Sequence, residues 1–204
     1  MKAFASILFV VLMSLPTAVL AQPDAQPVAL APTAAQESFA AIKALAGEWE
    51  GVVTIAEMPD VSPRMHVSIR VTSRGNVVVH EFQEAGTLLD ATQYDHPVTM
   101  FYVDEDQLNL VHYCDAGNRP RMIGTRSEDG KTFDFELQEV GGDPTYHMHH
   151  IVFDVIDADH HVEEFTFLMG DKPMHARFDL TRTESREDWT ARDVAALIPP
   201  TPDR

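Results

Sequence analysis

Alternating apolar and polar side chains dominate the chain from about residue 47 to residue 182. In the clearest early example Met65, Val67 and Ile69 occupy every second position, and Gly75-Asn76 then marks a turn before the next apolar run. Such alternation is typical of strands that bury one face. The pattern predicts about ten strands, among them residues 52–55, 65–72, 77–82, 98–103, 108–114, 119–127, 131–138, 147–157, 161–169 and 172–182.

The last two strands give the clearest register. Gly170-Asp171 is a two-residue turn with glycine first, which suits a type II′ hairpin. Counting back from this turn places Phe167 opposite Met174 and Phe165 opposite Ala176. These side chains are therefore predicted to share one apolar wall.

A meander of this length leaves two unpaired edges unless it closes or is covered. Only two short helices are predicted as a cover, at residues 34–46 and 185–197. Closure removes both edges and makes one interior from alternate residues. The predicted fold class is therefore all-β, an antiparallel meander closed as a roughly ten-stranded barrel with a short N-terminal helix and a short C-terminal helix.

The first 21 residues differ from the strand-rich region. They combine Lys2, an apolar run at 7–15 and small residues before Gln22, which indicates a signal peptide. No second apolar run follows, so we expect no stable membrane insertion after signal removal. The protein is thus predicted to be secreted or periplasmic.

Composition divides the remaining chain into three parts. Residues 22–33 are rich in proline and alanine, which predicts a disordered leader. Residues 34–183 carry the strand pattern and form the predicted barrel domain, and residues 184–204 form a short helix and tail. No further domain boundary is predicted after residue 34.

Charge and cysteine content narrow the classes of partner. The formal net charge is −17, and this excess of acid disfavours binding to nucleic acid phosphates. Cys114 is the only cysteine, so an exported form has no intramolecular disulfide and depends on packing. A small molecule remains the expected partner.

The stretch from 107 to 126 carries the most distinctive chemistry. If residues 115–118 form a four-residue loop, His112 lies opposite Arg121 and Leu110 lies opposite Ile123. An inward arginine and imidazole would favour a carboxylate headgroup, since arginine stays charged and binds two oxygens at once. The sequence thus predicts a small hydrophobic and anionic ligand, fatty-acid-like in shape.

Other inward positions complete the predicted ligand site. They are large and apolar, and they line the cavity or, if it is small, fill it. In addition to His112 and Arg121, the predicted ligand-binding residues are Phe101, Leu110, Ile123, Phe135, Phe153 and Phe165. In a second interpretation, Arg121 or Arg119 stacks on Trp49, a neighbouring hydroxyl or carbonyl bonds His112, and the set closes the barrel floor.

The chain also carries a motif resemblance, in Gly47-Glu48-Trp49, which opens the first strand after a short helix, and in two arginines of the last strand, Arg177 and Arg182. This arrangement resembles the lipocalin-like, or calycin, barrels. The resemblance implies structural roles for Gly47, Trp49 and Arg182, with the arginine packed over the tryptophan at the closed end. With Gly51 added, the motif also resembles the haem-binding nitrobindin group, and residues 112–122 resemble uncharacterised exported bacterial proteins.

Three other functions remain open from the sequence. In a haem barrel, His80, His112 or His149 would ligate the iron. A lipid-acting enzyme would use His112 as an acid or base, and a solid-core barrel would serve as an interaction module. No catalytic residue is assigned, since Glu163 and Glu164 point to opposite faces.

No metal site is predicted from the histidines. Imidazoles on adjacent strands can converge at zinc. Six histidines were considered, at positions 147, 149, 150, 160, 161 and 175. In the predicted register, however, no three of them lie close together.

Overall fold

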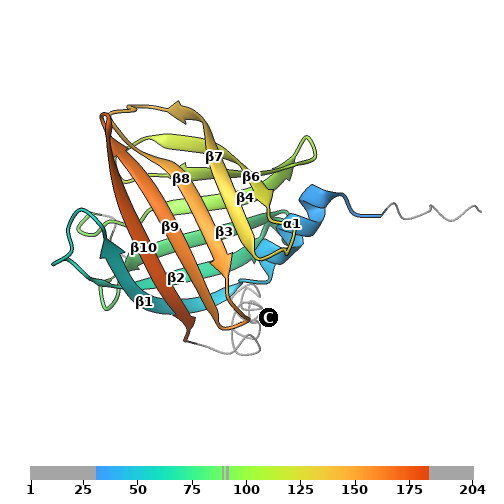
Figure 1. The fold of residues 1–204 in the computed structure, drawn as a ribbon, viewed down its shortest axis with the longest axis horizontal. Coiled ribbons are helices and arrows are strands. Elements are labelled where there is room, and N and C mark those ends of the chain that lie inside the picture. Colours follow the sequence, from blue (N-terminus) through green and yellow to red (C-terminus); the bar gives the residue numbers. More distant parts are fainter. Residues whose placement is uncertain (1–30, 89, 91, 184–204) are drawn as a thin grey trace, which may run out of the picture. The chain divides into compact units, whose positions relative to one another are not determined.

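The computed structural model describes residues 31–88, 90 and 92–183, and these form a closed antiparallel barrel (Figure 1). One helix, α1, precedes ten strands, with a short 3-10 turn between the second and third. The elements are α1 (Ala34–Lys43), β1 (Gly47–Ile55), β2 (Arg64–Thr72), η1 (Ser73–Gly75), β3 (Val77–Glu84), β4 (Val98–Asp104), β5 (Gln107–Tyr113), β6 (Arg119–Arg126), β7 (Thr132–Gly141), β8 (Tyr146–Val155), β9 (His160–Met169) and β10 (Lys172–Arg182).

The predicted all-β barrel is confirmed. Each strand pairs with its neighbour in sequence, and β1 pairs with β10 from Trp49↔Arg182 to Ile55↔Ala176 to close the sheet. The N-terminal helix is also observed. The predicted signal peptide, most of the leader and the C-terminal helix lie outside the described residues. Within the described part of the chain, none of the helices has the length and hydropathy needed to span a membrane.

The register of the last hairpin is as predicted. Phe167 lies opposite Met174 and Phe165 lies opposite Ala176, so their side chains face the interior together. Gly170 has φ +60°, a left-handed conformation that glycine adopts at little steric cost. A two-residue turn leaves no freedom for the flanking strands to slip, which is why sequence counting succeeds here.

The predicted register of β5 with β6 is wrong by one residue. Val111, rather than His112, lies opposite Arg121, and Leu110 lies opposite Met122. The loop has three residues instead of four, because the Cys114 amide donates to the Asn118 carbonyl and Gly117 takes φ +79°. Since side chains alternate with a period of two, this single step turns residues 119–126 over.

The predicted register of β6 with β7 is wrong for a related reason. A three-residue loop at residues 128–130 would place Ile123 opposite Phe135, whereas Ile123 lies opposite Glu136 and Gly124 lies opposite Phe135. Here the loop is longer than predicted by one residue. The Asp129 carboxylate accepts from the Lys131 amide and the Ser127 hydroxyl, and the Ser127 amide donates to the Thr132 carbonyl.

Helix α1 covers one end of the barrel. It starts at Thr33, whose hydroxyl accepts from the Gln36 amide while the Gln36 side chain accepts from the Thr33 amide. Its apolar side buries Phe39 and Ile42 in the same core cluster as Trp49. This end is therefore closed by packed side chains, and the opposite end is where the interior can open.

Candidate functional site

A cavity of about 180 Å³ enters the barrel at the end opposite α1. Its walls are mostly apolar, and its polar atoms lie at the mouth and on one side chain deeper inside. The lining residues are Val53, Ile55, Pro63, Met65, Phe82, Asp95, Pro97, His112, Cys114, Asp115, Tyr146, Phe167, Met174, Ala176 and Phe178. The residues belong to seven strands and three connecting segments, so the cavity is a product of the closed barrel.

His112 provides the deep polar group of this cavity. Its side chain is buried, and its Nδ1 lies 2.8 Å from the Thr99 hydroxyl on the neighbouring strand. Burial, together with the charge of the nearby His80, lowers the pKa of His112 to about 3. The imidazole is therefore neutral at neutral pH, and Thr99 can fix either tautomer because a hydroxyl both donates and accepts.

The mouth of the cavity is acidic. Asp95 and Asp115 line it, and the described residues of its lining include no lysine or arginine. Burial raises the pKa of the Cys114 thiol to about 11 and that of Tyr146 to about 12, so both groups are neutral at neutral pH. The thiol donates to a carboxylate oxygen of Asp115 at 3.2 Å. The entrance thus carries negative charge and no compensating cation.

Two predicted ligand-binding residues do not reach the interior. Arg121 lies on the outer face, where its Nε donates to Glu139 at 2.8 Å and raises the pKa of the guanidinium. Ile123 shares that face, because it lies two residues further along β6. The predicted pairing of Arg121 with His112 at a carboxylate is therefore wrong. The cause is the three-residue loop that follows Cys114.

The remaining predicted lining residues fill the middle of the barrel. The ring centroid of Phe101 lies 5.4 Å from that of Phe135 and 5.5 Å from that of Phe153, and the rings meet at steep interplanar angles. Leu110 and Phe165 are buried in the same cluster. None of these five residues lines the open cavity, so the structure places them as packed core below it.

A buried acid with two imidazoles lies in the same interior. His80 Nε2 contacts both carboxylate oxygens of Glu163 at 3.1 Å, and His161 Nε2 contacts one of them at 2.9 Å. All three side chains are at most 1% exposed. Burial alone would raise the pKa of Glu163, but the charge of His80 and hydrogen bonds from both imidazoles outweigh it and lower the pKa to about 2.

This His80–Glu163–His161 triad was not predicted from the sequence. His161 and Glu163 have the same parity along β9 as Phe165 and Phe167, which the hairpin register had already placed inside. Parity alone would have located two members of the triad. The third member, His80, approaches from across the barrel, and no local pattern indicates that contact.

The closed end is organised by Trp49. Arg182 lies over its indole ring, 4.0 Å from the ring centroid, and donates to the Ala46 carbonyl at 2.8 Å. Gly47 has φ +147°, and a Cβ there would lie 2.0 Å from an Arg182 nitrogen. His161 also packs against the tryptophan, with the two rings nearly perpendicular and 4.2 Å between their centroids. The Gly-x-Trp motif thus makes room for the arginine.

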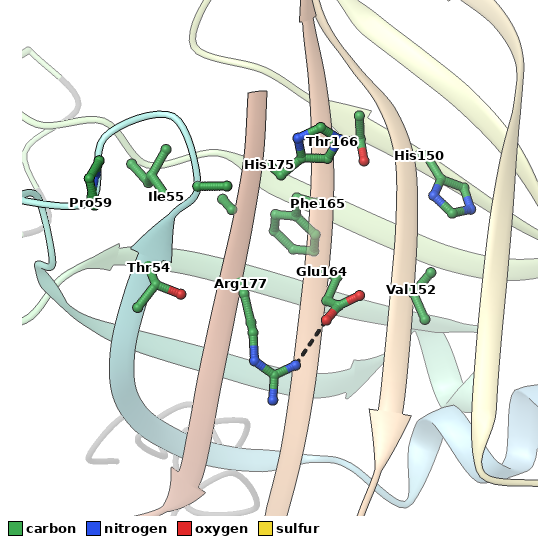
Figure 2. A pocket seen from close by; sticks show the side chains of 12 residues that line it. Thr54, Ile55, Pro59, His150, Val152, Glu164, Phe165, Thr166, His175 and Arg177 are labelled. Atoms are coloured by element: carbon green, nitrogen blue, oxygen red, sulfur yellow. Dashed lines mark hydrogen bonds and ion pairs between the residues drawn. The ribbon is translucent and has the colours of Figure 1, made fainter. Parts of the chain in front are cut away.

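A second hollow of about 510 Å³ lies on the outer face of the barrel (Figure 2). We call it the outer groove; it runs over β8, β9 and β10 to the segment after β1. Strand register sets His150, Thr166 and His175 in one row, and Figure 2 shows Thr166 between the two imidazoles. Glu164 and Arg177 form an ion pair at 2.9 Å on its floor.

The three histidines considered for haem lie in different surroundings. His80 belongs to the buried triad, His112 faces the cavity, and His149 lies in the irregular part of β8 with a buried Nδ1. Pockets that hold cofactors and drug-sized ligands usually have volumes of roughly 300–1,000 Å³. The open cavity, at about 180 Å³, favours a ligand smaller than haem.

Comparison with known proteins establishes the fold alone. No family model matches the chain, and no curated protein matches it. The crystal structure of Rv2717c from M. tuberculosis has a TM-score of 0.54 at 17% identity, covering 72% of this chain and 98% of that one. The fold is a lipocalin-like barrel. A weaker likeness is to the S-type phycobiliprotein lyase CPES from Guillardia theta, with a TM-score of 0.40 at 8% identity over 76% of this chain and 100% of the lyase.

Proposed function

We propose that the lipocalin-like barrel binds a small, largely apolar molecule in the cavity at its open end. The observation that carries the proposal is a hollow of about 180 Å³ whose apolar walls hold one buried imidazole, that of His112. Apolar pockets with few polar groups are typical of small-molecule sites. His112 donates or accepts the single hydrogen bond that orients the ligand, according to the tautomer that Thr99 fixes.

The charge of the mouth favours a neutral or cationic ligand over a fatty-acid-like anion. Asp95 and Asp115 would repel a carboxylate at the entrance, and His112 is neutral at neutral pH. The guanidinium that was predicted to hold such a carboxylate lies on the outer face. A short alcohol or amine satisfies both the apolar walls and the acidic rim.

Binding is favoured over acid–base catalysis. A general base works best with a pKa near the working pH, whereas the pKa of His112 is lowered to about 3. Its partner is the Thr99 hydroxyl, and no carboxylate is hydrogen-bonded to this imidazole among the described residues. A positioned but weakly basic imidazole suits recognition.

The test uses three six-carbon probes that differ in charge: hexan-1-ol, hexylamine and hexanoate. The full-length chain carries ¹³C-methyl methionine, because Met65 and Met174 line the cavity while Met100 lies exposed on the outside. We expect hexan-1-ol and hexylamine to shift the Met65 and Met174 signals and leave Met100 unchanged. Hexanoate should bind more weakly than either probe.

Matched variants separate the cavity from the surface. Met174→Trp should block the cavity and abolish the shifts, whereas Met100→Trp should leave them intact. His112→Leu should weaken hexan-1-ol binding by roughly fivefold to tenfold, the effect of one lost hydrogen bond of about 1 kcal/mol. If no probe binds and no ligand copurifies in native mass spectrometry, the barrel has a solid core and the interaction-module alternative replaces this proposal.

We also propose that the chain is exported, on the basis of the signal-like residues 1–21. In a Gram-negative host, intact mass should show a periplasmic protein that begins at Gln22. Leu12→Arg would interrupt the apolar run and should leave an unprocessed chain in the cytoplasm. An unprocessed wild-type chain would contradict export without affecting the binding proposal.

A further inference from the structure

Three metal-ligating side chains meet on the outer face at the edge of the outer groove. Asp134 and Glu136 lie two residues apart on β7 and therefore share one face, and His150 on β8 is the direct partner of Glu136. His150 Nε2 lies 2.8 Å from Asp134 Oδ1 and 3.8 Å from Glu136 Oε1. One ligand atom from each residue falls within 4.8 Å of the others.

These distances suit one ion. Zinc binds imidazole nitrogen and carboxylate oxygen at about 2.0–2.2 Å, so two ligand atoms of a tetrahedral site lie roughly 3.3–3.5 Å apart. The two observed separations of 2.8 and 3.8 Å lie on either side of that value. The side chains of Asp134 and Glu136 are 45% and 73% exposed and can adjust, whereas the strand backbone fixes the three Cα positions.

Other histidines on the outside of this barrel also contact carboxylates, but in a different geometry from His150. His160 and His175 each contact one carboxylate, from Asp179 and Glu57. His66 contacts two, but Glu48 approaches its Nε2 and Glu50 approaches its Nδ1. Those carboxylates lie on different sides of the ring. Among the described residues, only the set with His150 has one ligand atom from each of three residues within 4.8 Å of both others.

The outer groove supplies the second observation. His150 lines this hollow of about 510 Å³, so an ion held by this imidazole would lie at the edge of a space large enough for a water or a small ligand (Figure 2). Metal sites with three protein ligands and an open fourth position are typical of centres that bind or activate a further molecule. Imidazole with two carboxylates suits zinc, manganese or cobalt more than calcium.

We propose that Asp134, Glu136 and His150 bind a divalent transition-metal ion at the edge of the outer groove, with a remaining coordination position facing the groove. The site shares no residue with the interior cavity. Occupied or empty, it is independent of the proposed binding of an apolar molecule.

Isothermal titration of the untagged full-length chain with ZnCl₂ tests the site. We expect one zinc per chain, and His150→Gln or Asp134→Asn should weaken binding at least about 100-fold, since even outer-sphere changes cost roughly 10- to 100-fold. His66→Gln removes a histidine that also contacts two carboxylates and should change nothing. Asp179→Asn removes the same charge as Asp134→Asn and should also change nothing.

Two further measurements keep the result decisive. Cobalt should give a visible absorption band in the wild type that His150→Gln abolishes, and Cys114→Ser should retain it, because that thiol lies at the open end of the barrel. If Asp134→Asn unfolds the chain, the more exposed Glu136→Gln replaces it. Zinc binding that survives His150→Gln, or that falls equally in His66→Gln, would overturn the assignment.

Discussion

Glu163 is a carboxylate without solvent contact in an interior built mainly of phenylalanine. Burying a charge is costly unless opposite charge and hydrogen bonds compensate it. His80 and His161 provide that compensation, each through Nε2. Their Nδ1 atoms have no hydrogen-bond partner among the described residues. Both imidazoles therefore depend on the Glu163 carboxylate for hydrogen bonding.

Replacing the acid should therefore be strongly destabilising. We expect Glu163→Gln to lower the free energy of unfolding by about 3–5 kcal/mol, because the amide is uncharged and places an NH₂ donor against His80 Nε2, which contacts both carboxylate oxygens. The adjacent Glu164 is the matched control, since it points outward and pairs with Arg177 on the surface. Glu164→Gln should change stability by less than about 1 kcal/mol in urea unfolding. Equal effects of the two substitutions would contradict the role of the triad.

The triad also predicts how stability depends on pH. The pKa of Glu163 is lowered to about 2 in the folded protein, against about 4.3 in an unfolded chain. Its contribution is then fully present above about pH 4.5 and is lost as the pH falls toward 2. The stability difference between wild type and Glu163→Gln, measured by urea unfolding from pH 7 to pH 2, should stay constant at first and shrink in that window. A difference that widens in acid would have the wrong sign.

Arg182 is the second residue whose environment predicts a large effect. Its side chain is 5% exposed, lies over Trp49 and donates to the Ala158 and Ala46 carbonyls. We expect Arg182→Met to lower the free energy of unfolding by about 2–4 kcal/mol, the sum of lost charge-assisted bonds and the cation–π contact. Arg177→Met, at a half-exposed position on the same strand, should cost less than about 1 kcal/mol. Urea unfolding of both variants decides the point.

At the scale of strands, sequence counting succeeded where the turn leaves no choice of length. Gly170-Asp171 gave the correct β9–β10 register, and the alternation of Val67 with Ile69 gave the correct inward face. Counting failed where polar side chains changed the length of a loop. Asn118 shortened one turn by pairing with Cys114, and Asp129 lengthened the next.

These one-residue errors explain why only one of the two polar side chains predicted to face the interior does so. His112 lies before the first misjudged loop and keeps its predicted inward face, whereas Arg121 lies after it and faces out. The histidine–carboxylate set at His150 was missed for a different reason. Its carboxylates come from β7, and the connection between β7 and β8 is irregular. The β7–β8 register therefore could not be derived by counting residues from a turn.

The strand that closes the barrel depends on Gly51. A Cβ at this position would lie 1.8 Å from the Asp179 carbonyl oxygen on β10, which is backbone and cannot rotate away. We expect Gly51→Ala to destabilise the protein by about 1–3 kcal/mol. In hydrogen exchange, the β1–β10 amides should lose more protection than those of the β9–β10 hairpin. Thr54→Ala, on the outer side of β1, should leave both measures nearly unchanged.

For the barrel as a whole, the two ends have different roles. Trp49, Arg182 and α1 close one end with packed side chains, whereas His112 lies below the opening at the other. Between them, register places His80, Thr99 and His112 side by side on β3, β4 and β5. A row of polar side chains thus crosses a core that is otherwise apolar, and it connects the interior cavity with the buried triad.

The net charge predicts how salt affects the folded protein. At −17, self-repulsion destabilises the compact state, and salt screens exposed charges over about 10 Å at 0.1 M and about 3 Å at 1 M. Surface ion pairs such as Arg64–Glu50 and Arg121–Glu139 lose some attraction as well, but each is worth little. The repulsion between like charges therefore dominates.

Raising NaCl from 10 mM to 0.5 M should increase Tm by roughly 2–4 °C if screening relieves about 1 kcal/mol. The rise should level off at high salt, unlike the steady effect of an excluded osmolyte such as sucrose. A fall in Tm would mean that the surface ion pairs outweigh the net repulsion.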